Sequence, residues 1–104
     1  MHIQINTDKN VDGADAFANQ IKVIVEGSLN RFSEHITRVE VYLSDENSDK
    51  AGTRDKRCLM EARLKGLQPI AVAHQASNLD QSVQGAAEKL NNKIESDLGR
   101  LGKY

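Results

Sequence analysis

The chain has 104 residues, of which 38% are hydrophobic and 28% charged, so it is long enough for one modest core and too rich in apolar side chains for a disordered protein. It contains no run of about 18 apolar residues, and its first residues lack the order of a signal peptide. Cys58 is the single cysteine, which excludes an internal disulfide. We therefore expect a cytoplasmic protein without a membrane partner.

A net charge of −1 hides an uneven distribution along the chain. Residues 1–48 carry a net charge of −4 and residues 49–104 a net charge of +3. The segment 50–65 alone carries +4, because six basic side chains stand against two acidic ones. Such a segment favours an anionic partner, although lysines and arginines on a protein surface are usually only solvated.

The N-terminal part of the chain predicts a strand followed by a helix. Residues 2–6 alternate between polar and apolar side chains, which is typical of a half-buried strand. After a polar turn, Asp12 can cap a helix whose apolar side chains recur three and four residues apart: Ala14, Phe17, Ile21, Ile24, Val25, Leu29 and Phe32. Gly27 lies inside this helix, where glycine costs about 1 kcal/mol relative to alanine, so we expect a neighbouring element to pack closely against it.

The middle of the chain predicts three consecutive strands, at residues 36–44, 57–65 and 70–74. The polar segment 45–55 is interpreted as a loop, and residues 66–69 as a tight turn. Alternation assigns these side chains to the inner face of the sheet: Val39, Val41, Leu43, Cys58, Met60, Ala62, Leu64, Ile70, Val72 and His74. The outer face would stay exposed and carry an ion-pair ladder of Arg38, Glu40, Glu61 and Arg63, with Tyr42 beside it.

The last quarter of the chain, from about Ser77 to Leu101, predicts a long amphipathic helix capped by Ser77 or Asn78. Its apolar stripe consists of Leu79, Val83, Ala86, Ala87, Leu90, Ile94, Leu98 and Leu101. The element order therefore predicts one α+β domain over residues 1–104, a βαβββα two-layer sandwich. Its four-stranded, mostly antiparallel sheet would carry both helices on one face, with the first strand parallel to the second.

No pattern of side chains in the chain is typical of an enzyme. Cys58 has the inward parity of a strand, where cysteine is usually a small hydrophobe. The three histidines lack the spacing of metal ligands, and the chain has no phosphate-binding loop. We expect no catalytic residue, metal, cofactor or small-molecule substrate. The enzymatic hypothesis that remains, and the weakest one for this chain, is a small hydrolase that uses Cys58 or His74.

The basic side chains fall into two groups. Lys22, Arg31, Lys89 and Lys93 are predicted on the exposed sides of the two helices, and Lys89 and Lys93 share one side because they are four residues apart. Two helices lying side by side would present these cations to phosphates. Proteins recognise duplex RNA mainly by its shape and by contacts to its phosphate backbone, so spaced cations of this kind are sufficient. The second group lies in the basic segment and consists of Lys56, Arg57 and Arg63.

Three pieces of the sequence carry a resemblance to a known family. They are Ile3-Gln4-Ile5, the junction His35-Ile36-Thr37 with the following Val39-x-Val41-x-Leu43-Ser44, and the run Glu88-Lys89-Leu90. With the element order, they make the chain resemble, over nearly its whole length, the ribosome hibernation-promoting factors, also called ribosome-associated inhibitor A or ribosomal subunit interface proteins. The resemblance implies a fold similar to a double-stranded RNA-binding domain. It also implies binding to the 16S rRNA of the small ribosomal subunit, where members occlude tRNA and mRNA sites under stress.

The resemblance also assigns roles to single residues. Arg31 falls where the family has a basic residue late in the first helix, Lys89 matches the lysine of an Asp-Lys-Leu run, and Lys93 is a neighbouring cation. The chain looks like a short form without a dimerisation domain. It also looks like a divergent branch, because Asp80 stands where the family has an aromatic residue, and because Asn91-Asn92 and the segment 55–64 depart from the family pattern.

A protein-interaction module is the alternative hypothesis. In it, the exposed sheet face around Tyr42 and Leu59 would pair with a partner or with a second copy in a weak homodimer, without binding RNA.

Overall fold

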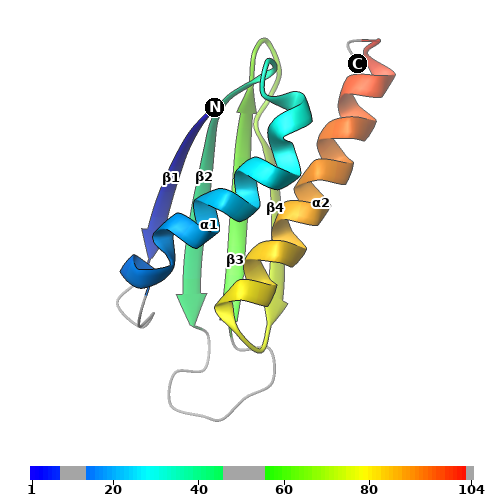
Figure 1. The fold of residues 1–104 in the computed structure, drawn as a ribbon. Helices are drawn as coiled ribbons and strands as arrows, with labels where there is room; N and C mark the ends of the chain where they lie inside the picture. Colours follow the sequence, from blue (N-terminus) through cyan, green and yellow to red (C-terminus); the bar gives the residue numbers. More distant parts are fainter. Residues whose placement is uncertain (8–13, 46–55, 103–104) are drawn as a thin grey trace.

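The computed structural model of the chain describes residues 1–7, 14–45 and 56–102 (Figure 1). The elements follow the predicted βαβββα order: β1 (His2–Thr7), α1 (Ala14–Leu29), a short 3₁₀ turn η1 (Asn30–Phe32), β2 (Ile36–Asp45), β3 (Lys56–Leu64), β4 (Ile70–Ala76) and α2 (Leu79–Arg100). Asp45 is the last residue of β2, and the rest of the predicted loop lies outside the described residues, as does the predicted cap Asp12.

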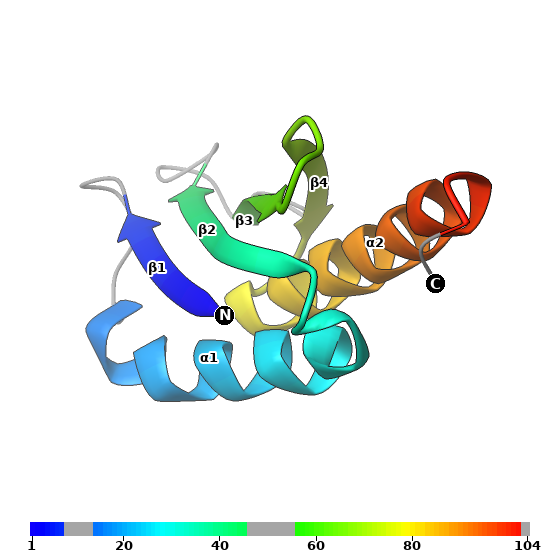
Figure 2. The same ribbon diagram turned by 90° about the horizontal axis from the view of Figure 1, so that it is seen from above.

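The four strands form one mixed sheet in the order β1-β2-β3-β4. β1 is parallel to β2, whereas β2–β3 and β3–β4 are antiparallel pairs. Both helices lie on the same side of this sheet, and no helix or strand of the described residues covers its opposite face (Figure 2). The prediction of a two-layer α+β sandwich is therefore confirmed.

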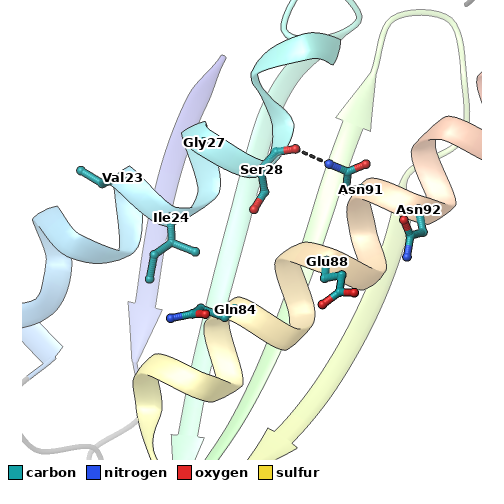
Figure 3. A pocket seen from close by; sticks show the side chains of 8 residues that line it. All are labelled: Val23, Ile24, Gly27, Ser28, Gln84, Glu88, Asn91 and Asn92. Atoms are coloured by element: carbon teal, nitrogen blue, oxygen red, sulfur yellow. Dashed lines mark hydrogen bonds between the residues drawn. The ribbon is translucent and has the colours of Figure 1, made fainter.

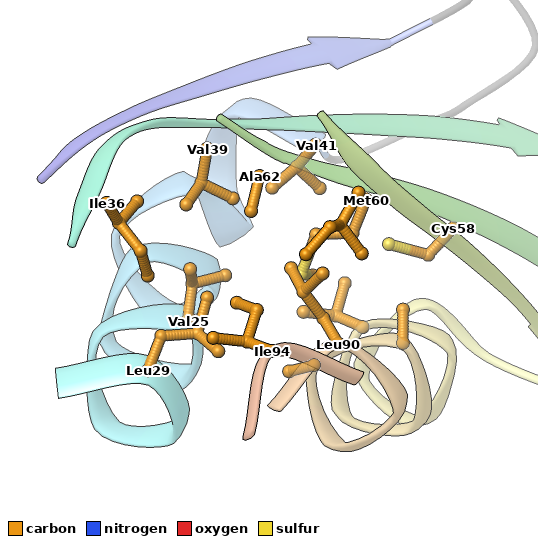
Figure 4. Close-up of a cluster of buried hydrophobic side chains, with 14 of the residues drawn as sticks. Val25, Leu29, Ile36, Val39, Val41, Cys58, Met60, Ala62, Leu90 and Ile94 are labelled. Atoms are coloured by element: carbon orange, nitrogen blue, oxygen red, sulfur yellow. The ribbon is translucent and has the colours of Figure 1, made fainter. Parts of the chain in front are cut away.

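The hydrophobic core fills the space between the sheet and the two helices (Figure 4). The inner-face side chains predicted from alternation are buried, except that Val72 and His74 are only partly buried. Two side chains of the predicted helical stripes are instead exposed. Phe17 is 39% exposed because the first turn of α1 lies beside the edge strand β1, and Leu101 is 52% exposed because α2 ends one residue before it.

Asn78, one of the two candidates, is the N-cap of α2. Its side-chain oxygen accepts a hydrogen bond from the backbone N–H of Gln81 at 2.8 Å, which satisfies one of the unpaired donors of the first turn. Asp80 lies in that turn and Arg100 in the last one, so both complement the helix dipole. Arg100 also contacts Asp97 at 2.6 Å.

The close approach expected at Gly27 occurs at a different glycine. A Cβ atom added at Gly27 would meet nothing within 4 Å, so the prediction for this residue was wrong. A Cβ atom added at Gly85 of α2 would lie 2.1 Å from Cδ2 of His74 on β4. The glycine therefore lets α2 pack onto the imidazole ring, which places His74 on the inner side of the sheet as predicted.

Candidate nucleic-acid interface

The groove between the two helices does not contain the predicted cations. We call it the helix groove, and the residues that line it are Val23, Ile24, Gly27, Ser28, Gln84, Glu88, Asn91 and Asn92 (Figure 3). Its one charged side chain is Glu88. The side of α2 that faces α1 is polar, because Asn91 donates a hydrogen bond to the backbone oxygen of Ser28 and Asp80 accepts one from Gln20 at 3.2 Å.

Arg31 lies in η1, directly after α1, and links this end of the helix to α2. Its guanidinium donates to Glu95 at 2.8 Å and to Asn91 at 2.7 Å, and it stacks over the ring of Phe32 with 4.6 Å between Cζ and the ring centroid. Both members of the ion pair remain nearly half exposed. Arg31 therefore holds the two helices together at the surface, and Glu95 already balances its charge.

Lys89 and Lys93 lie on the other side of α2, toward β4. The Nζ of Lys89 donates a hydrogen bond to the backbone oxygen of Ala73 at 2.9 Å. Because β4 is an edge strand, this contact satisfies a carbonyl that no neighbouring strand can reach. A carbonyl has no formal charge, so this contact does not balance the positive charge of Lys89 with a negative one. Lys93 instead pairs with Asp97, four residues along the helix, at 3.2 Å.

One cation of each predicted group meets the other at the edge of β4. A hollow of about 430 Å³, here called the β4-edge hollow, is lined by Arg57, Ala73, His74, Gln75 and Lys89. Arg57 comes from the basic segment and Lys89 from α2, and strand pairing brings them together because Arg57 is the register partner of Gln75. Arg57 has further contacts, and Lys56 beside it pairs with Asp45 across β2 and β3 at 3.1 Å.

The remaining two predicted cations lie elsewhere. Arg63 is at the opposite end of β3, roughly 20 Å from Arg57 at about 3.4 Å per residue, and its Nε lies 3.5 Å from Glu61. Lys22 is exposed on α1 and lines a hollow beside β1 with Ile3, Ile5 and Ala18. The seven predicted cations therefore occupy several separate surfaces and not one patch.

The outer face of the sheet carries the predicted ladder with an additional bond. Glu40 pairs with Arg38, and Arg63 with Glu61, while Glu40 and Glu61 are register partners. The hydroxyl of Tyr42 also donates to Glu40 at 2.6 Å, and with 9% exposure Glu40 is buried, contrary to the prediction. The i,i+2 spacing on one strand face was the sequence signal for this bond.

This bond shifts both ionisation equilibria. The hydrogen bond from Tyr42, with the charges of Arg38 and Arg63, holds the pKa of Glu40 below its ordinary value against the opposing effect of burial. The same bond, followed by burial and by the charge of Glu40, raises the pKa of Tyr42 above its ordinary value of 10.0. At neutral pH the pair is therefore a carboxylate held by a neutral phenol.

Cys58 and His74 are register partners on β3 and β4, but the pair is not equipped for nucleophilic catalysis. The thiol is fully buried, and burial raises its pKa to about 12. The reactive species is the thiolate, which is essentially absent at neutral pH with such a pKa. Among the described residues, no group of three or more His, Cys, Asp or Glu side chains is placed to hold a metal ion.

Residues 3–101 match the model of the family described as "Sigma 54 modulation protein / S30EA ribosomal protein". The chain belongs to this family. Membership implies association with the ribosome, and the family is not known as one of enzymes. None of the described helices is long and apolar enough to cross a membrane.

Two solved structures share the fold. The ribosomal subunit interface protein from Coxiella burnetii superposes with a TM-score of 0.72 at 18% identity, covering 95% of this chain and 99% of that one. The N-terminal domain of protein Y from Thermus thermophilus superposes with a TM-score of 0.63 at 22% identity, covering 92% and 98%. A comparison with curated protein sequences gave no match.

Proposed function

We propose that residues 1–104 act as one cytoplasmic, non-enzymatic domain that binds the 16S rRNA of the small ribosomal subunit. Bound there, the domain blocks the tRNA and mRNA sites by steric occlusion and so idles ribosomes under stress. The observation that carries this proposal is the match to a ribosomal protein family across residues 3–101. The shared fold of two proteins named for protein Y and for the ribosomal subunit interface supports it.

The contacts at the edge of β4 favour Lys89 as a phosphate ligand, and Arg57 lines the same hollow. Phosphate binding depends on cations that displace condensed counterions, and Lys89 has a neutral carbonyl as its partner in the protein. Arg31 and Lys93 must exchange a carboxylate for a phosphate. The pair of Arg31 with Glu95 is nearly half exposed, and such pairs contribute only about 0–1 kcal/mol. Asp97 keeps Arg100 when Lys93 leaves, so either exchange costs little.

Co-sedimentation with purified small subunits and whole ribosomes across a salt series tests the proposal directly. We expect stoichiometric binding to the small subunit that weakens steeply as salt rises, because phosphate contacts release counterions. Competition with tRNA on the same subunits then tests occlusion. A protein that stays at the top of the gradient even at low salt would show that the family fold serves another purpose in this chain.

Charge reversal at Lys89 tests the assignment of this residue. Lys89→Glu should weaken binding to the small subunit and reduce the slope of log K against log salt by about one or more. Lys65→Glu is the matched control, because Lys65 is also exposed and the change in net charge is identical. Equal losses in the two variants would mean that Lys89 acts only through the overall charge of the protein.

A further inference from the structure

Four side chains form a row across the outer face of the sheet, one from each strand. Asn6, Tyr42, Leu59 and Ala73 are consecutive register partners on β1, β2, β3 and β4. This row contains the exposed aromatic ring of the sheet, because Tyr42 is 39% exposed. The helix layer covers only the opposite face of the sheet (Figure 2), so the ring of Tyr42 is open to a ligand.

The ring of Tyr42 is held in place before any ligand arrives. Its hydroxyl donates to Glu40 at 2.6 Å, and Glu40 is itself paired with Arg38, so the phenol is fixed at its far end. A hollow of about 320 Å³, here called the Tyr42 hollow, lies beside the ring and is lined mainly by Tyr42, Leu59, Ser44, Thr7 and Arg57. A fixed ring loses little conformational entropy when a second ring stacks on it.

Positive charge continues from this hollow around the edge of the sheet. Arg57 lines both the Tyr42 hollow and the β4-edge hollow, where Lys89 follows. On the other side of Tyr42, Glu40 and Glu61 are register partners, and each is already paired with an arginine, Arg38 and Arg63. A ligand with a planar apolar ring and a chain of negative charges can therefore place its ring at Tyr42 and its charges at Arg57 and Lys89, which no carboxylate separates among the described residues that line the two hollows.

We propose that this face binds an unpaired stretch of RNA, with one base stacked on Tyr42 and the adjoining phosphates running past Arg57 to Lys89. The inference rests on the proposed function and deepens it, because it adds a single-strand site on the sheet side of the domain. Bases in a duplex are stacked on each other, whereas unpaired bases stack on aromatic side chains.

The size of the apolar surface favours a base over a protein partner. A stable protein interface buries about 800 Å² on each partner around a hydrophobic centre, whereas the large apolar side chains described on this face are Tyr42 and Leu59, with the small Ala71 and Ala73 beside them on β4. One exposed ring is sufficient for one base.

Tyrosine fluorescence provides a direct test, because the chain has no tryptophan and only two tyrosines. In a Tyr104→Phe protein, the emission comes from Tyr42 alone. We expect a single-stranded RNA of about eight nucleotides to quench this emission, and a fully paired duplex of the same composition to leave it unchanged. Quenching by the duplex to the same extent would contradict stacking.

Binding of a labelled RNA to variants, measured by fluorescence anisotropy, distinguishes the loss of the Tyr42 ring from a general disturbance of the fold. Tyr42→Ala should lower the affinity for the single strand about five- to hundredfold, the usual contribution of one stacked base, whereas Tyr42→Phe keeps the ring and should bind within a few-fold of the parent. Phe17→Ala is the matched control, because Phe17 is also 39% exposed but lies on α1, in the helix layer. An equal loss in the control would overturn the site.

Ribosome co-sedimentation of the same proteins distinguishes this inference from the proposed function. If the single strand leaves Tyr42 emission unchanged while the protein still binds small subunits, the sheet-face site is wrong and the proposed function stands. If neither RNA nor ribosome is bound, both are wrong. If the Tyr42 emission per molecule falls as the protein concentration rises in the absence of RNA, the face is an interface between protein copies, and the inference is wrong.

Discussion

At the scale of single residues, the contact between Tyr42 and Glu40 couples the protonation of two strand neighbours. The lowered pKa of Glu40 gives stability that is present above the ordinary pKa of a glutamate and is lost as pH falls through the lowered value. The raised pKa of Tyr42 gives stability that is present below 10.0 and is lost as pH rises through the raised value. The hydrogen bond between Tyr42 and Glu40 therefore stabilises the fold throughout the neutral pH range.

We predict that Tyr42 titrates above 10.0 when phenolate absorbance is followed in a Tyr104→Phe protein. Glu40→Gln should lower the midpoint, because it removes the acceptor that holds the phenol proton and the charge that opposes phenolate. Glu61→Gln is the control and should lower it less, since Glu61 acts on Tyr42 only through its charge. A midpoint at or below 10.0 in the parent would show that the bond is not formed in solution.

At the scale of elements, two glycines that lie within helices, Gly27 in α1 and Gly85 in α2, have opposite surroundings. Gly27→Ala should stabilise the protein by about 0.5–1 kcal/mol, because alanine is the better helix residue and its Cβ meets nothing within 4 Å. Gly85→Ala should destabilise it by about 1–3 kcal/mol, because the Cβ would overlap the imidazole of His74 at 2.1 Å. Urea unfolding of each variant measures both changes.

A double mutant tests whether overlap with His74 is the reason why Gly85→Ala destabilises the protein. If overlap with His74 is the reason, His74→Ala should remove most of the cost of Gly85→Ala, so that the two changes are strongly non-additive. Additive losses would mean that Gly85 is required for another reason. Gly27→Ala combined with His74→Ala should be additive, since no contact joins the two sites.

Periodicity was sufficient to predict the elements, because burial of one face imposes a period of two on strands and of about 3.6 on helices. The inner parity of Cys58, Met60 and Ala62 followed from it directly. Periodicity does not, however, predict how α2 is rotated about its own axis relative to β4 and α1. That rotation turns Lys89 toward β4 and Asn91 toward α1, and it decides which glycine needs to be small.

At the scale of the whole molecule, the same limit governs the candidate site. The predicted strand 57–65 already separates Arg57 from Arg63, but only the pairing of β3 with β4 and the packing of α2 bring Arg57 and Lys89 to one hollow. Register also built the row of Asn6, Tyr42 and Leu59 from three distant segments. Pairing between segments that are distant in the sequence leaves no local pattern. A single sequence therefore predicts which residues are candidates for a site better than it predicts which of them lie close together.

Cys58 reports on the cooperativity of the whole molecule. It is fully buried beneath the helix layer, and burial raises the pKa of its thiol to about 12, so alkylation requires the core to open. A domain of this size has a free energy of unfolding of about 5–15 kcal/mol, so we expect iodoacetamide to modify Cys58 about a thousandfold or more slowly than an exposed thiol. The reference is a Cys58→Ala, Lys65→Cys protein, whose thiol lies on an exposed turn.

The denaturant dependence of this reaction then decides between global and local opening. If the sheet and both helices open together, the free energy obtained from alkylation should fall with urea at the same slope as global unfolding followed by circular dichroism. Core side chains from the strands and both helices form one cluster around Cys58, which favours this outcome. A reaction whose rate barely changes with urea would instead mean that β4 or α2 detaches locally, and the β4-edge hollow would then belong to a mobile part of the molecule.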